Sequence, residues 1–97
     1  MEQEKEEKAE DWFELGKYHS SFKNSRNAIE CYQRCVKKDH DHFRAWANMA
    51  AEFFKLKNFD RSIECCKEAL KINRNDNHSW LTLAANYFEL NEIPKLL

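Results

Sequence analysis

The chain has 97 residues, with one glycine, one proline and a net charge of −1 from 16 basic and 17 acidic residues. So little glycine and proline excludes most hairpins and sheet corners, and the composition therefore predicts an all-α protein of helices joined by short turns. Because the charge is nearly balanced, there is no overall positive field for a nucleic acid or an anionic membrane, and we expect neither as a partner.

Residues 1–8 are mostly charged, and Glu4 and Lys8 have the four-residue spacing that supports a solvated helix. We therefore expect them to form a charged N-terminal extension of the first helix. This segment lacks the apolar core of a signal peptide, and no stretch approaches the ~18 apolar residues of a membrane span. A cytoplasmic or nuclear location is the expectation.

Three tryptophans, Trp12, Trp46 and Trp80, follow one another at intervals of 34 residues. Each begins a stripe of residues that advances in steps of three and four, which is helical spacing. The later members of the three stripes are Leu15, Gly16, His19 and Phe22; Met49, Ala50, Phe53 and Leu56; and Leu83, Ala84, Tyr87 and Leu90. We expect the indole rings to lie between packed helices and His19 to be a core histidine.

A second helix with the same period is expected around residues 28–36 and again around 62–70. The small residues Gly16, Ala50 and Ala84 would let antiparallel helices approach closely. The chain thus divides into a first unit at 9–42, a second at 43–76 and a truncated third at 77–97. Since Pro94 stands where a proline commonly opens a helix, we expect that last helix to be cut short and apolar surface to be exposed at this end.

The pattern W-x-x-L-G, the later A-I-E-x-Y and the 34-residue period resemble the tetratricopeptide repeat, or TPR. The resemblance covers residues 9–97, which is about 2.6 repeats of this length. Departures are His19 and Cys66 at aromatic positions, and His40 and Arg74 in place of a proline between repeats. The resemblance implies a right-handed α-solenoid of antiparallel helix pairs that serves as a protein–protein interaction scaffold and performs no chemistry of its own.

In the TPR family, ligands usually lie on the concave surface that the first helices of the units line. We expect first-helix residues outside the packing stripe to face it, with apolar side chains as anchors, basic ones pairing with acidic groups and Asn48 bonding a partner backbone. The candidate partner-binding residues are Phe13, Lys17, Arg44, Asn48, Ala51, Lys55, Leu81, Thr82 and Phe88. The alternative is that the apolar members pack between adjacent repeats.

Co-chaperone members of the family hold a C-terminal carboxylate with two lysines, two asparagines and an arginine. Those positions fall here at Phe13, Lys17, Asn48, His78 and Thr82, of which only Asn48 matches in kind. A carboxylate needs several converging donors to offset its desolvation, so the sequence does not favour this kind of binding.

The four cysteines are Cys31, Cys35, Cys65 and Cys66, and we expect ordinary buried or half-buried thiols. A zinc site with His40 and His42 is disfavoured because the ligands would straddle a helix end. The sequence offers no nucleophile paired with a base and no glycine-rich phosphate loop. We therefore expect no enzyme activity, no metal and no cofactor.

Three readings of the function stay open at this point. The first is a scaffold that binds a peptide or helix segment of another protein. The second is an RNA-binding helical repeat, which would need a basic groove and exposed aromatic residues. The third is a purely architectural segment of a longer solenoid, and exposed ends would also permit end-to-end self-association.

Overall fold

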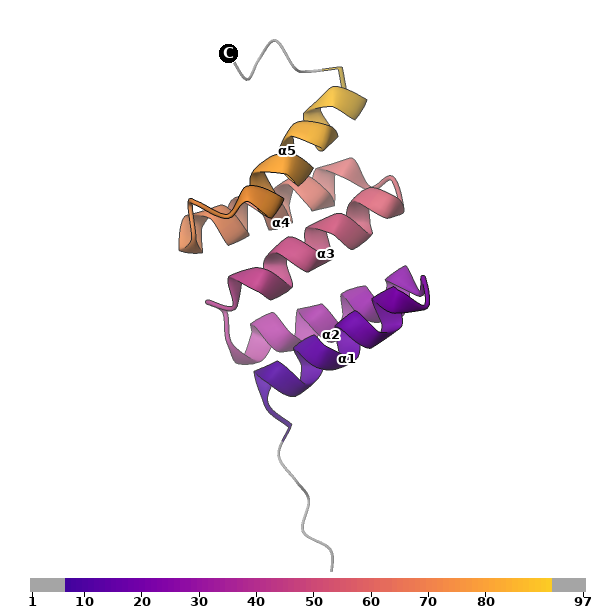
Figure 1. The fold of residues 1–97 in the computed structure, drawn as a ribbon, viewed down its shortest axis with the longest axis vertical. Helices are drawn as coiled ribbons and strands as arrows, with labels where there is room; N and C mark the ends of the chain where they lie inside the picture. Colours follow the sequence, from indigo (N-terminus) through magenta and orange to yellow (C-terminus); the bar gives the residue numbers. More distant parts are fainter. Residues whose placement is uncertain (1–6, 92–97) are drawn as a thin grey trace, which may run out of the picture.

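A computed structural model of the protein describes residues 7–91, and this part of the chain is helical with no strand. It contains α1 (Ala9–Ser21), α2 (Ser25–Lys38), α3 (Phe43–Lys55), α4 (Phe59–Ile72) and α5 (Asn77–Glu89). Figure 1 shows α1, α3 and α5 in a front layer, with α2 and α4 behind them. The predicted all-α class is confirmed.

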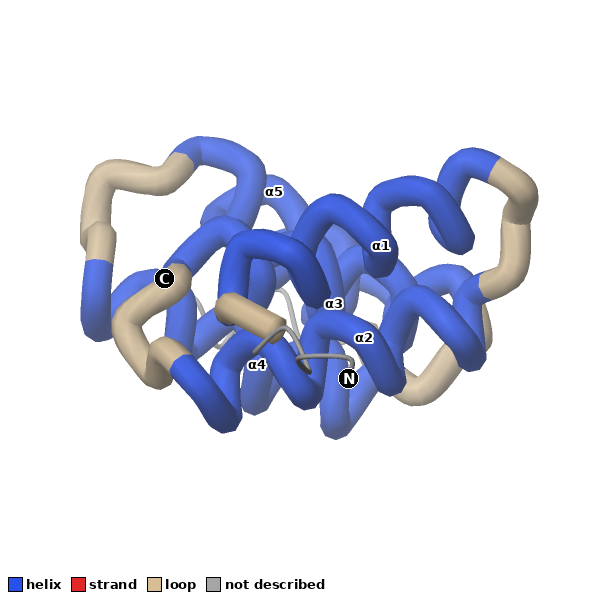
Figure 2. The backbone as a smooth tube through the Cα atoms, turned by 90° about the horizontal axis from the view of Figure 1, so that it is seen from below, coloured by secondary structure: helices blue, strands red, loops and turns tan. Residues whose placement is uncertain are grey.

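Successive helices pack as antiparallel pairs, α1 with α2 and α3 with α4, and each pair also contacts the next. The view along the stack in Figure 2 shows the helices joined by short loops at the two sides. The core runs between the layers and includes Phe13, Tyr32, Met49, Phe53 and Leu83. This is a solenoid of helix pairs, with α5 opening the third unit. None of the helices within residues 7–91 has the length and apolarity needed to cross a bilayer.

The turns inside each unit use the same backbone conformation at positions 34 residues apart. Lys23, Lys57 and Asn91 all have a positive φ, of 61°, 64° and 59°. Each follows the C-cap of a first helix, where a left-handed residue lets backbone N–H groups bond to the last carbonyls of the helix. Lysine occupies a position here that glycine or asparagine normally favours.

The turns between units also repeat. The Asp39 side chain accepts from the N–H of Asp41 at 3.1 Å, and the Asn73 side chain accepts from that of Asn75 at 3.2 Å. The Trp46 indole N–H donates to the carbonyl oxygen of His40 at 2.9 Å. Trp80 makes the equivalent bond to Arg74 at 2.7 Å. These bonds hold the chain where the family pattern has a proline.

The tryptophans are half-buried only in the two units where a second helix follows. Trp12 and Trp46 are half-buried against the core, but Trp80 is 51% exposed. The expectation of a wedged indole is wrong for Trp80, because the described residues include no second helix to cover α5. His19 is half-buried, so it is not a fully buried core histidine.

The first helix begins at Ala9, and Lys8 has an extended backbone with φ −95° and ψ 163°. The Asp11 carboxylate accepts from the Lys8 backbone N–H at 3.0 Å and so satisfies one of the free donors at the helix start. The expected helical extension is therefore wrong for residues 7 and 8. Its remainder, residues 1–6, and the helix expected at Pro94 lie outside the described residues.

Candidate functional site

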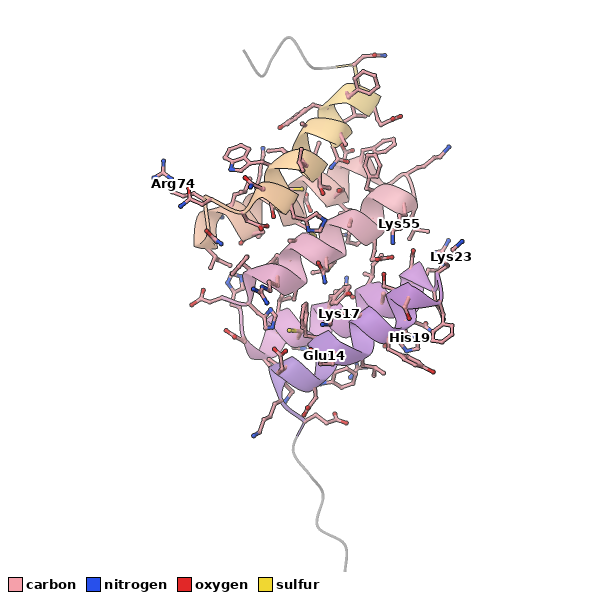
Figure 3. The ribbon with its side chains drawn as sticks, viewed as in Figure 1. Glu14, Lys17, His19, Lys23, Lys55 and Arg74 are labelled. Carbon is pink, nitrogen blue, oxygen red and sulfur yellow. The ribbon has the colours of Figure 1, made fainter. Side chains whose placement is uncertain are left out.

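A cavity of about 430 Å³ opens on the layer formed by α1, α3 and α5. Its lining comes from all three of these helices and from one residue of α2 behind them: Lys17, Ser20, Ser21, Tyr32, Asn48, Ala51, Glu52, Lys55 and His78. Figure 3 shows Lys17 on α1 and Lys55 on α3 in the front layer of the molecule. We call this space the concave cavity.

Tyr32 lies at the back of the concave cavity and is 1% exposed. Its ring fits because the facing residue on α1 is Gly16, where a Cβ would stand 2.5 Å from the Tyr32 Cε1 atom. The Asn48 side-chain amide donates to the Tyr32 hydroxyl at 3.5 Å, a long hydrogen bond. Burial raises the pKa of Tyr32 to about 12, more than the Asn48 hydrogen bond lowers it. The hydroxyl is therefore neutral and helps to orient Asn48.

Glu52 connects two units inside the same cavity. It is only 3% exposed, and its Oε2 accepts from Ser20 Oγ at 2.6 Å and from Lys55 Nζ at 3.2 Å. A buried carboxylate is costly unless it is paired in this way. Its Oε1 has no hydrogen-bond partner among residues 7–91. The Glu52 charge is thus largely committed to holding α1, α3 and Lys55 together.

The remaining polar groups of the cavity are mostly donors. Lys17 Nζ lies 3.3 Å from Glu14 on the exposed surface and 5.0 Å from the centroid of the Phe13 ring. His78 reaches the cavity from α5, and the Asn48 amide reaches it from α3. With Lys55 already paired to Glu52, the cavity offers Lys17, His78 and the Asn48 amide to a ligand. These groups favour a ligand that brings acceptors, such as backbone carbonyls and acidic side chains.

The structure brings together four of the nine candidate residues, since Lys17, Asn48, Ala51 and Lys55 all line the concave cavity. Five others do not line it: Phe13, Arg44, Leu81, Thr82 and Phe88. Arg44 is exposed over its neighbour Phe43 at 5.9 Å, and Thr82 is half-buried. Leu81 and Phe88 are 70% and 62% exposed on α5.

Phe13 is not an exposed anchor, contrary to the expectation, because it is 5% exposed. Its ring centroid lies 4.6 Å from that of His42 and 5.9 Å from that of Tyr32. The equivalent residues Ala47 and Leu81 are 3% and 70% exposed. Position within the repeat therefore does not decide exposure. Tyr32 on α2 and His42, the N-cap of α3, cover Phe13, and the described residues contain no further unit after α5 that could cover Leu81 in the same way.

Sequence reasoning missed Ser20, Ser21, Tyr32 and Glu52 as cavity residues. One signal was present for Ser20, which replaces the aromatic residue found at the equivalent Phe54 and Phe88. A signal was also present for Glu52, which is the single charged residue in the otherwise apolar run of residues 49–54. Tyr32 belongs to a second helix, which the concave-face argument does not consider.

The cysteines are all free and buried. Burial raises the pKa of Cys35 to about 11 and the pKa values of Cys65 and Cys66 to about 12. Within residues 7–91, no three side chains of histidine, cysteine, aspartate or glutamate gather as a metal site. The thiols therefore pack as small apolar groups in this part of the chain.

Comparison with known protein families gives two matches to models described as tetratricopeptide repeat, over residues 9–39 and 43–76. A curated relative, tetratricopeptide repeat-containing protein trd-1 of Caenorhabditis elegans, is 36% identical over 44 residues. That alignment covers 45% of this chain and 6% of the relative. The chain thus spans a small part of the length of the curated relative it matches.

Three solved structures illustrate the similarity of fold. The first TPR of Spaghetti (RPAP3), bound to HSP90 peptide SRMEEVD, has a TM-score of 0.86 at 25% identity, over 91% of this chain and 72% of that one. The TPR2B-domain:pHsp70-complex of yeast Sti1 has a TM-score of 0.84 at 25% identity, and the match covers 87% of this chain and 67% of that one. The MamA protein has a TM-score of 0.87 at 16% identity. The match covers 91% of this chain and 48% of MamA, so this chain spans about half of the length of MamA.

Proposed function

Because this chain belongs to the tetratricopeptide repeat family, we propose that it is a protein-interaction module that holds an extended peptide segment of a partner protein in the concave cavity. The observation that carries the proposal is the convergence of Lys17, Asn48 and His78 on one cavity from three different first helices. Each residue comes from a separate unit, so the stacking of the units sets the spacing of the three groups.

The similar structures support a peptide as the ligand. The first TPR of Spaghetti is bound to an HSP90 peptide, and the TPR2B domain of yeast Sti1 is in a complex with pHsp70. The helices of a stacked repeat are already ordered, so a peptide can bind without an ordering cost to the protein. The lining of the concave cavity has two lysines and one glutamate, and we therefore infer that the bound segment is acidic.

The ligand need not present a C-terminal carboxylate. Of the five positions that hold such a carboxylate in co-chaperone members, Phe13 is buried here, and neither Phe13 nor Thr82 lines the concave cavity. The donors that remain are spread along the cavity. They suit acidic side chains and backbone carbonyls of a peptide that passes through.

Calorimetric titration tests the proposal with the acidic peptide SRMEEVD, as the free acid and as its C-terminal amide. We expect both forms to bind with affinities within about threefold of each other. The Asn48→Ala variant should weaken both by about 5- to 20-fold, because one buried hydrogen bond is worth about 1–2 kcal/mol. Lys67→Ala, an exposed change on α4 away from the cavity, is the matched control and should have no effect.

Two results would count against the proposal. If neither form binds, or if Asn48→Ala and Lys67→Ala bind equally well, the concave cavity is not the site. If the free acid binds more than about tenfold more tightly than the amide, which is about 1.4 kcal/mol, the terminal carboxylate is recognised after all.

A further inference from the structure

The layer opposite the concave cavity contains a groove between α2 and α4. Two cavities, of about 540 Å³ and 460 Å³, lie end to end there, because Gln33 of α2 and Arg61 of α4 line both of them. At one end, His40 Nε2 approaches Glu68 Oε1 at 3.9 Å across the groove. The lining of α2 extends from Arg26 to Lys37, which is about 17 Å of helix. We call this space the convex groove.

The floor of the convex groove is apolar. Ile29, Val36, Met49, Phe53 and Cys65 line it and are only 2–8% exposed, so their packing in the core fixes the shape of the floor. No side chain of residues 7–91 fills the open volume above the floor. An apolar floor between two helices is a surface on which a third helix can pack.

The two walls of the convex groove differ in charge. Helix α2 carries four basic residues and one acidic residue over Ser25–Lys38, and two of the basic residues, Arg26 and Lys37, line the groove. The charges on α4 are paired locally, Arg61 with Glu64 at 3.3 Å and Lys71 with Glu68 at 3.0 Å. The groove is therefore basic along α2, while α4 lines it with one basic residue, Arg61, and two acidic residues, Glu64 and Glu68.

We propose that the convex groove is a second docking surface, which takes an amphipathic helix of a partner protein that places apolar side chains on the floor and acidic side chains over α2. Charge complementarity selects the acidic edge of the helix. This surface is separate from the concave cavity, so the two could be occupied together. The chain would then join two partners.

Single-stranded RNA fits the convex groove less well. Bases need exposed aromatic faces on which to stack. Of the aromatic rings in the groove, Phe53 is 8% exposed and has the Arg61 guanidinium 5.2 Å from its centroid. Trp46 is half-buried, with the His40 ring against it at 5.4 Å. The basic wall alone would attract a polyanion, but the floor gives no stacking platform.

The test uses two designed helical peptides of about 16 residues, enough to span the groove at 1.5 Å per residue. Both carry the same apolar stripe. One has glutamates along one edge, and the other has lysines at the same positions. Fluorescence anisotropy with the full chain should show the glutamate peptide binding at least about tenfold more tightly than the lysine peptide. Reversing the charge of the α2 wall with Arg26→Glu and Lys37→Glu should make the lysine peptide bind more tightly than the glutamate peptide.

Gln33→Trp supplies a steric test, because Gln33 is exposed and lines both cavities of the groove. This substitution should weaken the binding of the glutamate peptide at least about tenfold. Lys67→Trp, at the exposed equivalent position 34 residues later, is the matched control and should change binding less than about twofold. Asn48→Ala should leave this peptide unaffected, which separates the convex groove from the concave cavity.

The proposal is overturned by any of four results. The first two are no binding of the glutamate peptide at about 1 mM and equal binding of the glutamate and lysine peptides. The other two are an equal loss of affinity for the glutamate peptide in Gln33→Trp and Lys67→Trp, and a loss of its binding in Asn48→Ala. Tighter binding of a labelled single-stranded oligouridylate than of the glutamate peptide would also overturn it, because it would mark the groove as an RNA surface.

Discussion

Replacing Gly16 with alanine tests how closely α1 and α2 pack. In helix interiors this change normally stabilises by about 1 kcal/mol, since glycine is a poor helix former. Here the new Cβ would lie 2.5 Å from Cε1 and 2.7 Å from Cδ1 of Tyr32. The ring has no room to retreat because Tyr32 is 1% exposed and Phe13 packs against it. We therefore expect Gly16→Ala to destabilise the protein.

The magnitude follows from two opposing effects. Overpacking a well-filled core costs about 1–3 kcal/mol, and a contact this short lies in the upper half of that range, at about 2–3 kcal/mol. Subtracting the gain in helix propensity leaves a net loss of about 1–2 kcal/mol of unfolding free energy. The second unit carries Ala50 and Cys66 at the positions of Gly16 and Tyr32, so a larger residue on the first helix stands with a smaller one on the second.

A double-mutant cycle makes the prediction specific. Tyr32→Cys alone should cost about 3–4 kcal/mol through the cavity it leaves. In that background, Gly16→Ala has no ring to meet and should stabilise by about 1 kcal/mol. The coupling between the two changes is then about 2–3 kcal/mol. Urea unfolding followed by helical circular dichroism measures all four proteins. If Gly16→Ala stabilises the protein to the same extent in both backgrounds, the packing described here is wrong.

Four further outcomes are expected. Asp76→Ala should cost about 1 kcal/mol in urea unfolding, because the Asp76 side chain caps α5 by accepting from the Ser79 N–H at 3.2 Å; an unchanged midpoint would contradict this. Lys57→Gly should raise the unfolding free energy by about 0.5–1 kcal/mol by relieving its positive φ of 64°, whereas Lys67→Gly inside α4 should lower it by about 1 kcal/mol. Because burial raises the pKa values of the four thiols, they should react slowly with a disulfide reagent at pH 8 in the native protein, and all four should react only on unfolding. Rapid reaction of the thiols in the native protein would refute their burial. The pKa of Tyr32 is raised from 10.0 to about 12 in the folded state, so its contribution to stability is full below pH 10.0 and is lost as the pH rises towards about 12; Tyr32→Phe should flatten that decline.

The sequence was sufficient to predict the architecture because the information is local and repeated. Helical spacing after Trp12, Trp46 and Trp80 indicates the first helices, and the 34-residue period places the turns. Even the turn geometry repeats, with positive φ at Lys23 and again at Lys57. These features depend only on nearby residues and on one neighbouring helix.

The site was harder to predict because exposure depends on the next unit. Phe13 and Leu81 are equivalent in the repeat, yet one is 5% and the other 70% exposed. Glu52 shows the same difficulty. A glutamate on a first helix is expected to lie in solvent, but Ser20 of the preceding unit leaves space for its carboxylate and donates to it at 2.6 Å. Such pairings between units carry no periodic signal.

The central claim is that partner peptides are held in the concave cavity, and the most direct measurement is an NMR titration of the labelled chain with an acidic peptide. We expect the largest chemical-shift changes at Lys17, Asn48, Ala51 and His78, while the amide signals of α2 around Gln33 do not move. Shifts confined to α2 and α4, or to the exposed side of α5 around Leu81, would contradict it.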